Sequence, residues 1–230
     1  MKMYSKIQII IRSVLVFFIF YFSSYFQVIP IFLFHLNTNS LSSGAQVFLS
    51  TFSSMILFVI FFFVYRKELK KEFHIFINHF IENMDVGVRW WLLGLFIMMI
   101  SNVTITYFFR GGGANNEQVV QEMVHAVPWI MIISAGIIAP FNEEIVFRKA
   151  LKDVFHNKWI FSFLSFLLFG GAHVIGNASS LIDYFYIIPY GILGWAFAMA
   201  YSETDTIFTS MTMHMIHNTI LVLLSIFLLS

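Results

Sequence analysis

Two adjacent carboxylates and an arginine stand out where an apolar run ends in the second half of the chain. An ionisable side chain at membrane depth costs about 2.5–3.5 kcal/mol on insertion scales, so a membrane protein keeps one for pairing or for chemistry. Glu144 and Arg148 are four residues apart, which on a helix places them on one face as an ion pair. Glu143 is turned about 100° away from Glu144 and has no local cationic partner. Glu143 is therefore the carboxylate that needs a chemical explanation.

Four further polar side chains lie within apolar stretches: His173 in one, and His214, His217 and Asn218 in another. Alone, each would be an interhelical hydrogen-bond partner worth about 0.6–2 kcal/mol. Together with Glu143 they permit catalysis, because a poorly solvated carboxylate is a good general base and an imidazole can hold the attacking water. His214 and Asn218 share a helix face and could donate to an oxyanion, whereas His217 is turned about 60° to about 100° from them. The set predicts peptide hydrolysis without a covalent intermediate.

The composition places these residues in a membrane. The chain has 230 residues, of which 59% are hydrophobic and 11% are charged, against about 25% charged residues in a soluble domain. Lipid leaves no water for open backbone groups, so the apolar runs predict an all-α polytopic transmembrane helical bundle. A formal charge of +1 without a basic stripe argues against nucleic acid, and the absence of cysteine excludes disulfides, thiol catalysis and cysteine-ligated zinc.

The elements that must position the polar residues are about seven spans in a single membrane domain over residues 1–230. An amphipathic pattern predicts one interfacial helix at 72–84, and Trp90 with Trp91 reads as an aromatic belt that opens the third span. The glycine-rich stretch 110–117 predicts a flexible outer loop. Pro140 predicts a kink or break just before the glutamates, because proline lacks an N–H and crowds the carbonyl four residues back. The predicted spans are about 7–34, 46–65, 90–109, 128–140, 159–175, 181–201 and 207–229.

The distribution of basic residues predicts an orientation. Lysines and arginines gather at the amino terminus, at 66–71, at Arg89 and at 148–158, whereas Arg110 falls on the other side. Because basic loops stay in the cytoplasm, we expect the amino terminus and the active site to face the cytoplasm. The Phe- and Ile-rich, cysteine-free composition favours a bacterial cytoplasmic membrane.

Three sequence motifs, in order and on three predicted helices, resemble those of the CAAX-protease and bacteriocin-processing family, also called the Abi family of intramembrane proteases. The resemblance covers about residues 128–222, the expected catalytic core. Residues 1–127 carry none of the motifs, and we expect them to form variable helices that shape substrate access. Lys149 departs from the pattern, since members often carry glycine there. The motifs are Glu143-Glu144-xxx-Arg148, Phe169-xxx-His173 and His214-xxx-Asn218.

The resemblance implies an endopeptidase that hydrolyses a membrane-associated or secreted peptide or protein. Bacterial members are linked to maturation of secreted peptides or to bacteriocin immunity, and prenylated substrates are not expected in a bacterium. The first glutamate would be the base, the histidine of the second motif its water-binding partner, and the third motif the oxyanion holder. The second glutamate and the arginine would support the structure. The expected site is thus Glu143, His173, His214 and Asn218, supported by Glu144 and Arg148.

Other interpretations of the same residues stay open. Glu143, His173 and His214 form an acceptable catalytic zinc set, although we expect no cofactor because the resemblance favours a glutamate mechanism. A non-catalytic immunity or scaffold protein could bind a peptide or membrane partner through the same pocket. A proton-coupled carrier would also hold polar groups at mid-membrane, but the chain has no paired halves. The expected partners are a peptide or membrane-protein substrate and the lipid bilayer, not nucleic acid.

Overall fold

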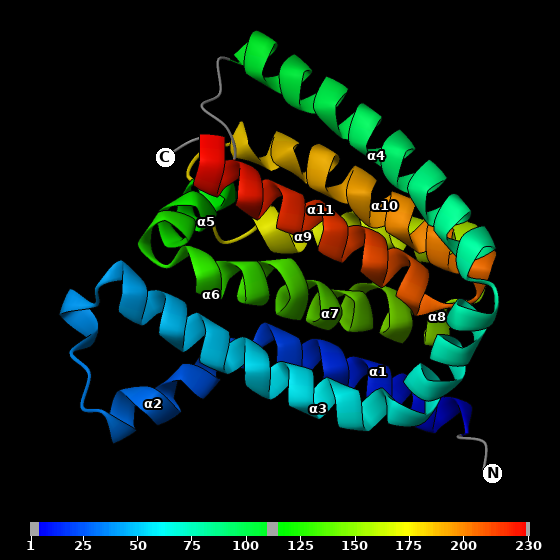
Figure 1. The fold of residues 1–230 in the computed structure, drawn as a ribbon, viewed down its shortest axis with the longest axis horizontal. Coiled ribbons are helices and arrows are strands. Elements are labelled where there is room, and N and C mark those ends of the chain that lie inside the picture. Colours follow the sequence, from blue (N-terminus) through cyan, green and yellow to red (C-terminus); the bar gives the residue numbers. More distant parts are fainter. Residues whose placement is uncertain (1–4, 110–114, 229–230) are drawn as a thin grey trace.

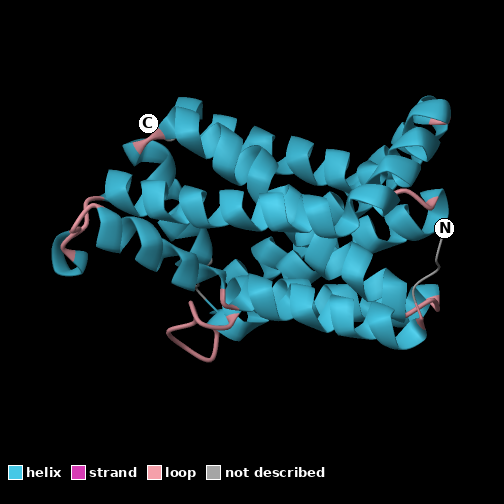
Figure 2. Cartoon of the chain, turned by 90° about the horizontal axis from the view of Figure 1, so that it is seen from below, coloured by secondary structure: helices cyan, strands magenta, loops and turns pink. Residues whose placement is uncertain are grey.

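The computed structural model describes residues 5–109 and 115–228, and this part of the chain is helical with no strand (Figure 2). The helices run along one common long axis, and the two ends of the chain lie at opposite ends of the molecule (Figure 1). This architecture confirms the predicted all-α bundle. The principal helices are α1 (Lys6–Tyr21), α2 (Val28–Leu33), α3 (Ser43–Asn78), α4 (Phe80–Phe109), α5 (Asn115–Ala126), α9 (Lys158–Val174), α10 (Ile187–Thr204) and α11 (Ile207–Leu228).

Five helices in the described residues are long and apolar enough to cross a membrane, or six if one bent pair counts as a span. The chain is therefore an integral membrane protein, and the predicted seven spans are approximate. The helix α9 has 17 residues and is shorter than the spans. The five are Ser43–Asn78, Phe80–Phe109, Pro128–Val154, Asp183–Thr204, which joins the turn η5 (Asp183–Tyr186) to α10, and Ile207–Phe227.

The first apolar run is not one straight helix, as predicted, but a bent pair. The chain turns by 54° between Lys6–Tyr21 and Ser23–Leu33, where the short helix η1 (Ser23–Gln27) interrupts it. The hydroxyl of Ser53 on α3 donates to the Ser23 carbonyl at 2.6 Å. This bond stabilises the bend because it gives a carbonyl at the break a partner from a neighbouring helix.

The predicted interfacial helix at 72–84 is not a separate helix. The helix α3 continues to Asn78 and α4 begins at Phe80, so Trp90 and Trp91 lie well inside α4 rather than at its start. Asn83 stabilises the break between the two helices: its side-chain amide donates to the carbonyls of Ile75, at 3.4 Å, and Phe76, at 3.2 Å. These bonds satisfy the carbonyls that the end of a helix leaves open.

Charged side chains connect several helices near the carboxyl end of α3, and Figure 1 shows this end of the bundle, where α3 meets α4. Glu72 is buried, and its carboxylate accepts from the Ile207 N–H, at 2.8 Å, at the first residue of α11. A negative group there complements the partial positive charge of a helix amino terminus. Arg12 on α1 pairs with Glu68 and Asp153. The amino-terminal helices therefore hold the end of the helix that carries His214.

The glutamates lie in one continuous helix, residues Pro128–Val154. The predicted break at Pro140 is absent, and a π-helical turn precedes this proline instead. A π-turn is wider than an α-turn, so the chain passes the proline without breaking. The segments of this helix are α6 (Pro128–Ile133), the π-turn η3 (Ser134–Ile138), α7 (Ala139–Glu144), the π-turn η4 (Ile145–Ala150) and α8 (Leu151–Val154).

The predicted outer loop at 110–117 is only partly open to comparison, since residues 110–114 lie outside the described residues. Residues 115–117 belong to α5, so the loop prediction is wrong there. The helix is stabilised because its apolar side chains pack against neighbouring helices. Val124 is buried in a cluster with Val47, Met131 and Val222. This cluster joins α5 to α3, α6 and α11.

Candidate functional site

The predicted ion pair between Glu144 and Arg148 is present and fully buried. The Arg148 Nε lies 3.3 Å from the Glu144 Oε1, and both side chains have no exposed surface. The guanidinium also lies against two aromatic rings, 4.4 Å from the centre of Phe169 and 5.5 Å from the centre of Phe197. Its two terminal nitrogens have no hydrogen-bond partner among the described residues. The aromatic faces and Glu144 together stabilise a cation that solvent does not reach.

His214 on α11 lies between the two glutamates. Its Nδ1 is 2.9 Å from the Glu144 Oε1, and its Nε2 is 3.5 Å from the Glu143 Oε2. The ring stacks on Phe197, with centres 5.0 Å apart. Glu144 is ion-paired and therefore accepts a hydrogen bond, so the Nδ1 carries a hydrogen and the Nε2 faces Glu143. Glu144 thus orients the imidazole as well as pairing with Arg148.

Glu143 differs from Glu144 in being partly exposed and in having no arginine at ion-pair distance among the described residues. Its side chain is 16% exposed, and His214 is its partner at ion-pair distance. Its Oε2 is buried and makes no hydrogen bond within the described residues. Glu144 also has a buried oxygen, Oε2, without a hydrogen bond in the described part of the chain, but its side chain is fully buried. Glu143 is therefore the more accessible of the two carboxylates.

His173 reaches the same cluster through an aromatic ring. Its Nδ1 lies 2.9 Å from the carbonyl oxygen of Phe169, one turn earlier on α9, and its ring stacks on Tyr190 with centres 4.7 Å apart. The Phe169 ring is 4.4 Å from the His173 ring and 5.6 Å from the His214 ring. A carbonyl oxygen only accepts, so the His173 Nδ1 carries the hydrogen and the Nε2 is left as an acceptor. No hydrogen bond between His173 and Glu143 occurs in the described structure.

Asn218 and His217 face different neighbours on the same helix. The Asn218 amide nitrogen donates to the carbonyl oxygen of Ala135 in η3, at 3.0 Å. His217 is buried and accepts from the Trp91 indole N–H on α4, at 3.3 Å. The structure thus brings Glu143, Glu144, Arg148 and His214 into direct contact. It links Asn218 to the helix of the glutamates and turns His217 towards α4.

Three neighbours of the site have little or no signal in the sequence. Phe197 has no motif around it, and the sequence predicts Trp91 to be part of an interfacial belt. The Ala135 carbonyl belongs to the backbone, so no side chain marks it. Pro140 removes the usual α-helical donor of the Gly136 carbonyl, so the sequence carries no direct signal for the open carbonyl of Ala135.

The described residues contain no group of three or more histidine, aspartate or glutamate side chains arranged to hold a metal ion. The alternative zinc set of Glu143, His173 and His214 is accordingly not gathered in one place.

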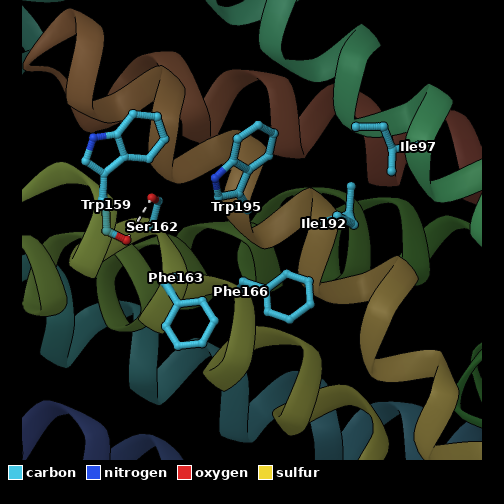
Figure 3. A pocket seen from close by; sticks show the side chains of 7 residues that line it. All are labelled: Ile97, Trp159, Ser162, Phe163, Phe166, Ile192 and Trp195. Carbon is cyan, nitrogen blue, oxygen red and sulfur yellow. Dashed lines mark hydrogen bonds between the residues drawn. The ribbon is translucent and has the colours of Figure 1, made fainter.

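A separate apolar groove of about 420 Å³ lies between α4, α9 and α10 (Figure 3). The hydroxyl of Ser162, the smallest polar group on its wall, donates to the Trp159 carbonyl of its own helix at 3.3 Å. None of the predicted site residues lines it, so the groove does not contain the glutamate cluster. Its lining residues are Ile97, Trp159, Ser162, Phe163, Phe166, Ile192 and Trp195.

Comparisons with known proteins agree with the motifs. The family model described as Type II CAAX prenyl endopeptidase Rce1-like matches residues 125–220. A protein of Bacillus subtilis (strain 168) named "Putative membrane peptidase YdiL" is 29% identical over 153 residues, which are 63% of this chain and 59% of that relative. The chain thus spans about three fifths of the length of the relative, and no solved structure matches. Both comparisons support the resemblance of residues 125–220 to the CAAX-protease and bacteriocin-processing family of membrane proteases.

Proposed function

We propose that the protein is an intramembrane endopeptidase in which Glu143 activates a water molecule. The observation that carries this proposal is the contrast between the two glutamates: Glu144 is fully buried and bound on one oxygen by Arg148 and His214, whereas Glu143 is 16% exposed and lies 3.5 Å from His214. In this cluster Glu144 has a structural role, because it is paired with Arg148, and Glu143 is available to react with water. Its substrate class is a membrane-associated or secreted peptide or protein.

In the proposed reaction, Glu143 takes a proton from water while the water oxygen forms a bond to the carbonyl carbon of the scissile amide. The His173 Nε2 accepts the other hydrogen of the same water and so orients it. The carbonyl oxygen becomes an oxyanion, which His214 and Asn218 bind. Glu143 then gives its proton to the amide nitrogen, the carbon–nitrogen bond breaks, and a carboxylic acid and an amine leave; the acid then gives its proton to the amine or to solvent.

The role of His214 sets a condition on its charge. Its Nδ1 is committed to Glu144, so the ring donates from Nε2 only when it carries both protons. Arg148, Glu144, an imidazolium at His214 and Glu143 then alternate in sign and sum to zero. When Glu143 takes the proton from water, the negative charge passes to the oxyanion, and the buried cluster keeps its balance. A low-dielectric site favours such a step, because no net charge is created in it.

Membrane peptidomics of producing cells tests the proposal. We expect the Glu143→Gln variant to accumulate in the membrane normally and to release no peptide that the unaltered protein releases, since glutamine keeps the shape but accepts no proton. Asp85→Asn is the matched control, because Asp85 is 66% exposed on α4 and its loss should leave the peptides unchanged. Peptide release by the Glu143→Gln variant would contradict the role of Glu143 as general base. If neither variant changes the peptide profile of the cells, the scaffold alternative is favoured.

We also propose that the site opens towards the cytoplasm of a bacterial cell. The support is the position of Glu143, a few residues before the basic cluster at 148–158, on the side that the charge rule assigns to the inside. The chain has no cysteine, so a thiol reagent labels only a cysteine that is introduced. Lys152→Cys should resist an impermeant thiol reagent in intact cells and react after lysis, whereas Thr38→Cys, before α3 at the other end (Figure 1), should react in both. Labelling of Lys152→Cys from outside would reverse the orientation.

A further inference from the structure

The starting point is a backbone carbonyl that its own helix leaves open. In an α-helix the Ala135 carbonyl would accept from the N–H of Ala139, but that N–H donates to Ser134 in the π-turn η3. In a π-helix the donor would be the N–H five residues on, at Pro140, which has none. The two regular donors to the Ala135 carbonyl are therefore both missing, one through the π-turn and the other through the proline.

Asn218 supplies the missing donor from another helix. Its side-chain amide nitrogen lies 3.0 Å from the Ala135 carbonyl oxygen. A second contact shows that α11 is pressed against η3 at this level: a Cβ added at Gly136 would lie 2.8 Å from the Thr219 Oγ1. The position of Asn218 relative to the helix of the glutamates is thus fixed by a hydrogen bond and by close packing.

The Asn218 amide has two hydrogens on one planar group. A bond from one hydrogen to the Ala135 carbonyl fixes the plane of the amide and therefore the direction of the other hydrogen. The proline that leaves this carbonyl open stands three residues before Glu143 on the same helix. Pro140 can thus determine the position of the Asn218 amide relative to Glu143.

We propose that Pro140 is a positioning residue for the reaction: it keeps the Ala135 carbonyl open, and this carbonyl aims the amide of Asn218 at the oxyanion. The inference rests on the proposed function. It assigns to the proline a role other than bending, since the helix Pro128–Val154 continues through it. A residue with an N–H at position 140 would compete with Asn218 for the Ala135 carbonyl.

A double-mutant cycle tests this inference, with the initial rate of peptide release from isotope-labelled native membrane vesicles as the readout. Pro140→Ala alone should lower the rate about tenfold, less than the 10²–10³ that loss of an oxyanion donor typically costs. In the Asn218→Ala background the same proline substitution should cost nothing further, because the amide it would disturb is gone. Equal costs in both backgrounds would overturn the inference and leave Pro140 as a packing residue.

A spectroscopic readout separates aiming from folding. With ¹⁵N-asparagine labelling, the side-chain amide signal of Asn218, assigned by its loss in Asn218→Ala, should shift in Pro140→Ala. Pro140→Ser restores the same N–H with a different side chain and should give the same shift and the same rate. Pro128→Ala is the matched control, because Pro128 begins α6, where a backbone N–H has no intrahelical partner, and it should change neither the signal nor the rate.

The outcomes distinguish this inference from the function on which it rests. If Glu143→Gln stays active, the proposed function fails whatever the cycle gives. If Glu143→Gln is inactive and the Asn218 amide signal does not move in Pro140→Ala, only the role of Pro140 fails. A different shift or rate in Pro140→Ser and Pro140→Ala would also overturn it, since the two share only the restored N–H.

Discussion

The helix of the glutamates and α4 are both apolar spans, but they meet different surroundings. In Pro128–Val154, 61% of the apolar window is buried inside the protein, against 11% in Phe80–Phe109. The buried helix is also the less hydropathic of the two, at 1.6 against 1.9. A helix facing lipid has no partners for polar groups, whereas a helix inside the bundle finds them on its neighbours. Of these two spans, the one with the lower mean hydropathy is the one that lies inside the bundle.

The largest expected difference between the two helices comes from removing one carboxylate in each. Glu144→Ala leaves Arg148 buried without its ion partner, which should cost about 3–5 kcal/mol. Asp85→Ala on α4 removes an exposed partner of Arg89, 3.0 Å away, and should cost less than about 1 kcal/mol. Thermal unfolding in detergent and the level of protein in the membrane measure both. Normal abundance of Glu144→Ala with lost activity would move Glu144 from support to catalysis.

A second contrast concerns how closely the helices pack. A Cβ at Gly170 on α9 would lie 2.5 Å from the Ile187 carbonyl oxygen, so Gly170→Ala should force α9 from α10 and cost about 1–3 kcal/mol. The same change at Gly44 on α3 meets only a side-chain methyl of Val127 at 3.6 Å and should be neutral or slightly stabilising. The unfolding temperatures of the two variants decide the matter. An unchanged Gly170→Ala variant would mean that α9 and α10 lie farther apart.

His217 tests the boundary between the site and α4. His217→Phe removes the acceptor of the Trp91 N–H, which should cost about 0.5–1.5 kcal/mol of stability and leave peptide release unchanged. In a Trp91→Phe background the same substitution should cost less, because the hydrogen bond is already lost. Complete loss of activity in His217→Phe would show that the wrong face of α11 has been assigned to the site.

The smallest effect should come from the lipid-facing side of α4. Val103 is 68% exposed, and Val103→Ala should change the free energy of unfolding by less than about 0.5 kcal/mol. The comparison is Phe147→Ala in the buried helix, where the side chain is 3% exposed and truncation should cost about 3–5 kcal/mol. Similar losses in the two variants would mean that α4 is covered by protein, for example by a second copy of the chain.

Local patterns in the sequence were sufficient for the parts of the site that lie on one helix. The spacing of Glu144 and Arg148 predicted their ion pair, because residues four apart on a helix are neighbours. Apolar runs located the helices for the same reason, since hydropathy is a local property. The break between α3 and α4 was not predicted, because the contact from Asn83 to the end of α3 depends on a turn whose geometry the apolar pattern does not contain.

Contacts between distant helices could not be predicted from local spacing. Nothing near His214 indicates that it lies between two carboxylates seventy residues away along the chain. The bond from Asn218 to the Ala135 carbonyl depends on a π-turn, and no periodicity marks where such a turn occurs. The family resemblance named the residues of the site, but their roles in catalysis stay predictions until the variants are assayed.

The short helix α9 has a consequence for the membrane itself. Seventeen residues rise about 26 Å, which is less than the ~30 Å hydrocarbon thickness of a typical bilayer. We expect lipid that contacts α9 to thin towards this length, at a cost of fractions of a kcal/mol per Å. His173 lies next to the carboxyl end of this helix, where thinning brings the headgroup region and its water closer to the site. Reconstitution in bilayers of increasing acyl-chain length should therefore lower the rate of hydrolysis steadily, and a rate independent of thickness would show that water reaches Glu143 by another route.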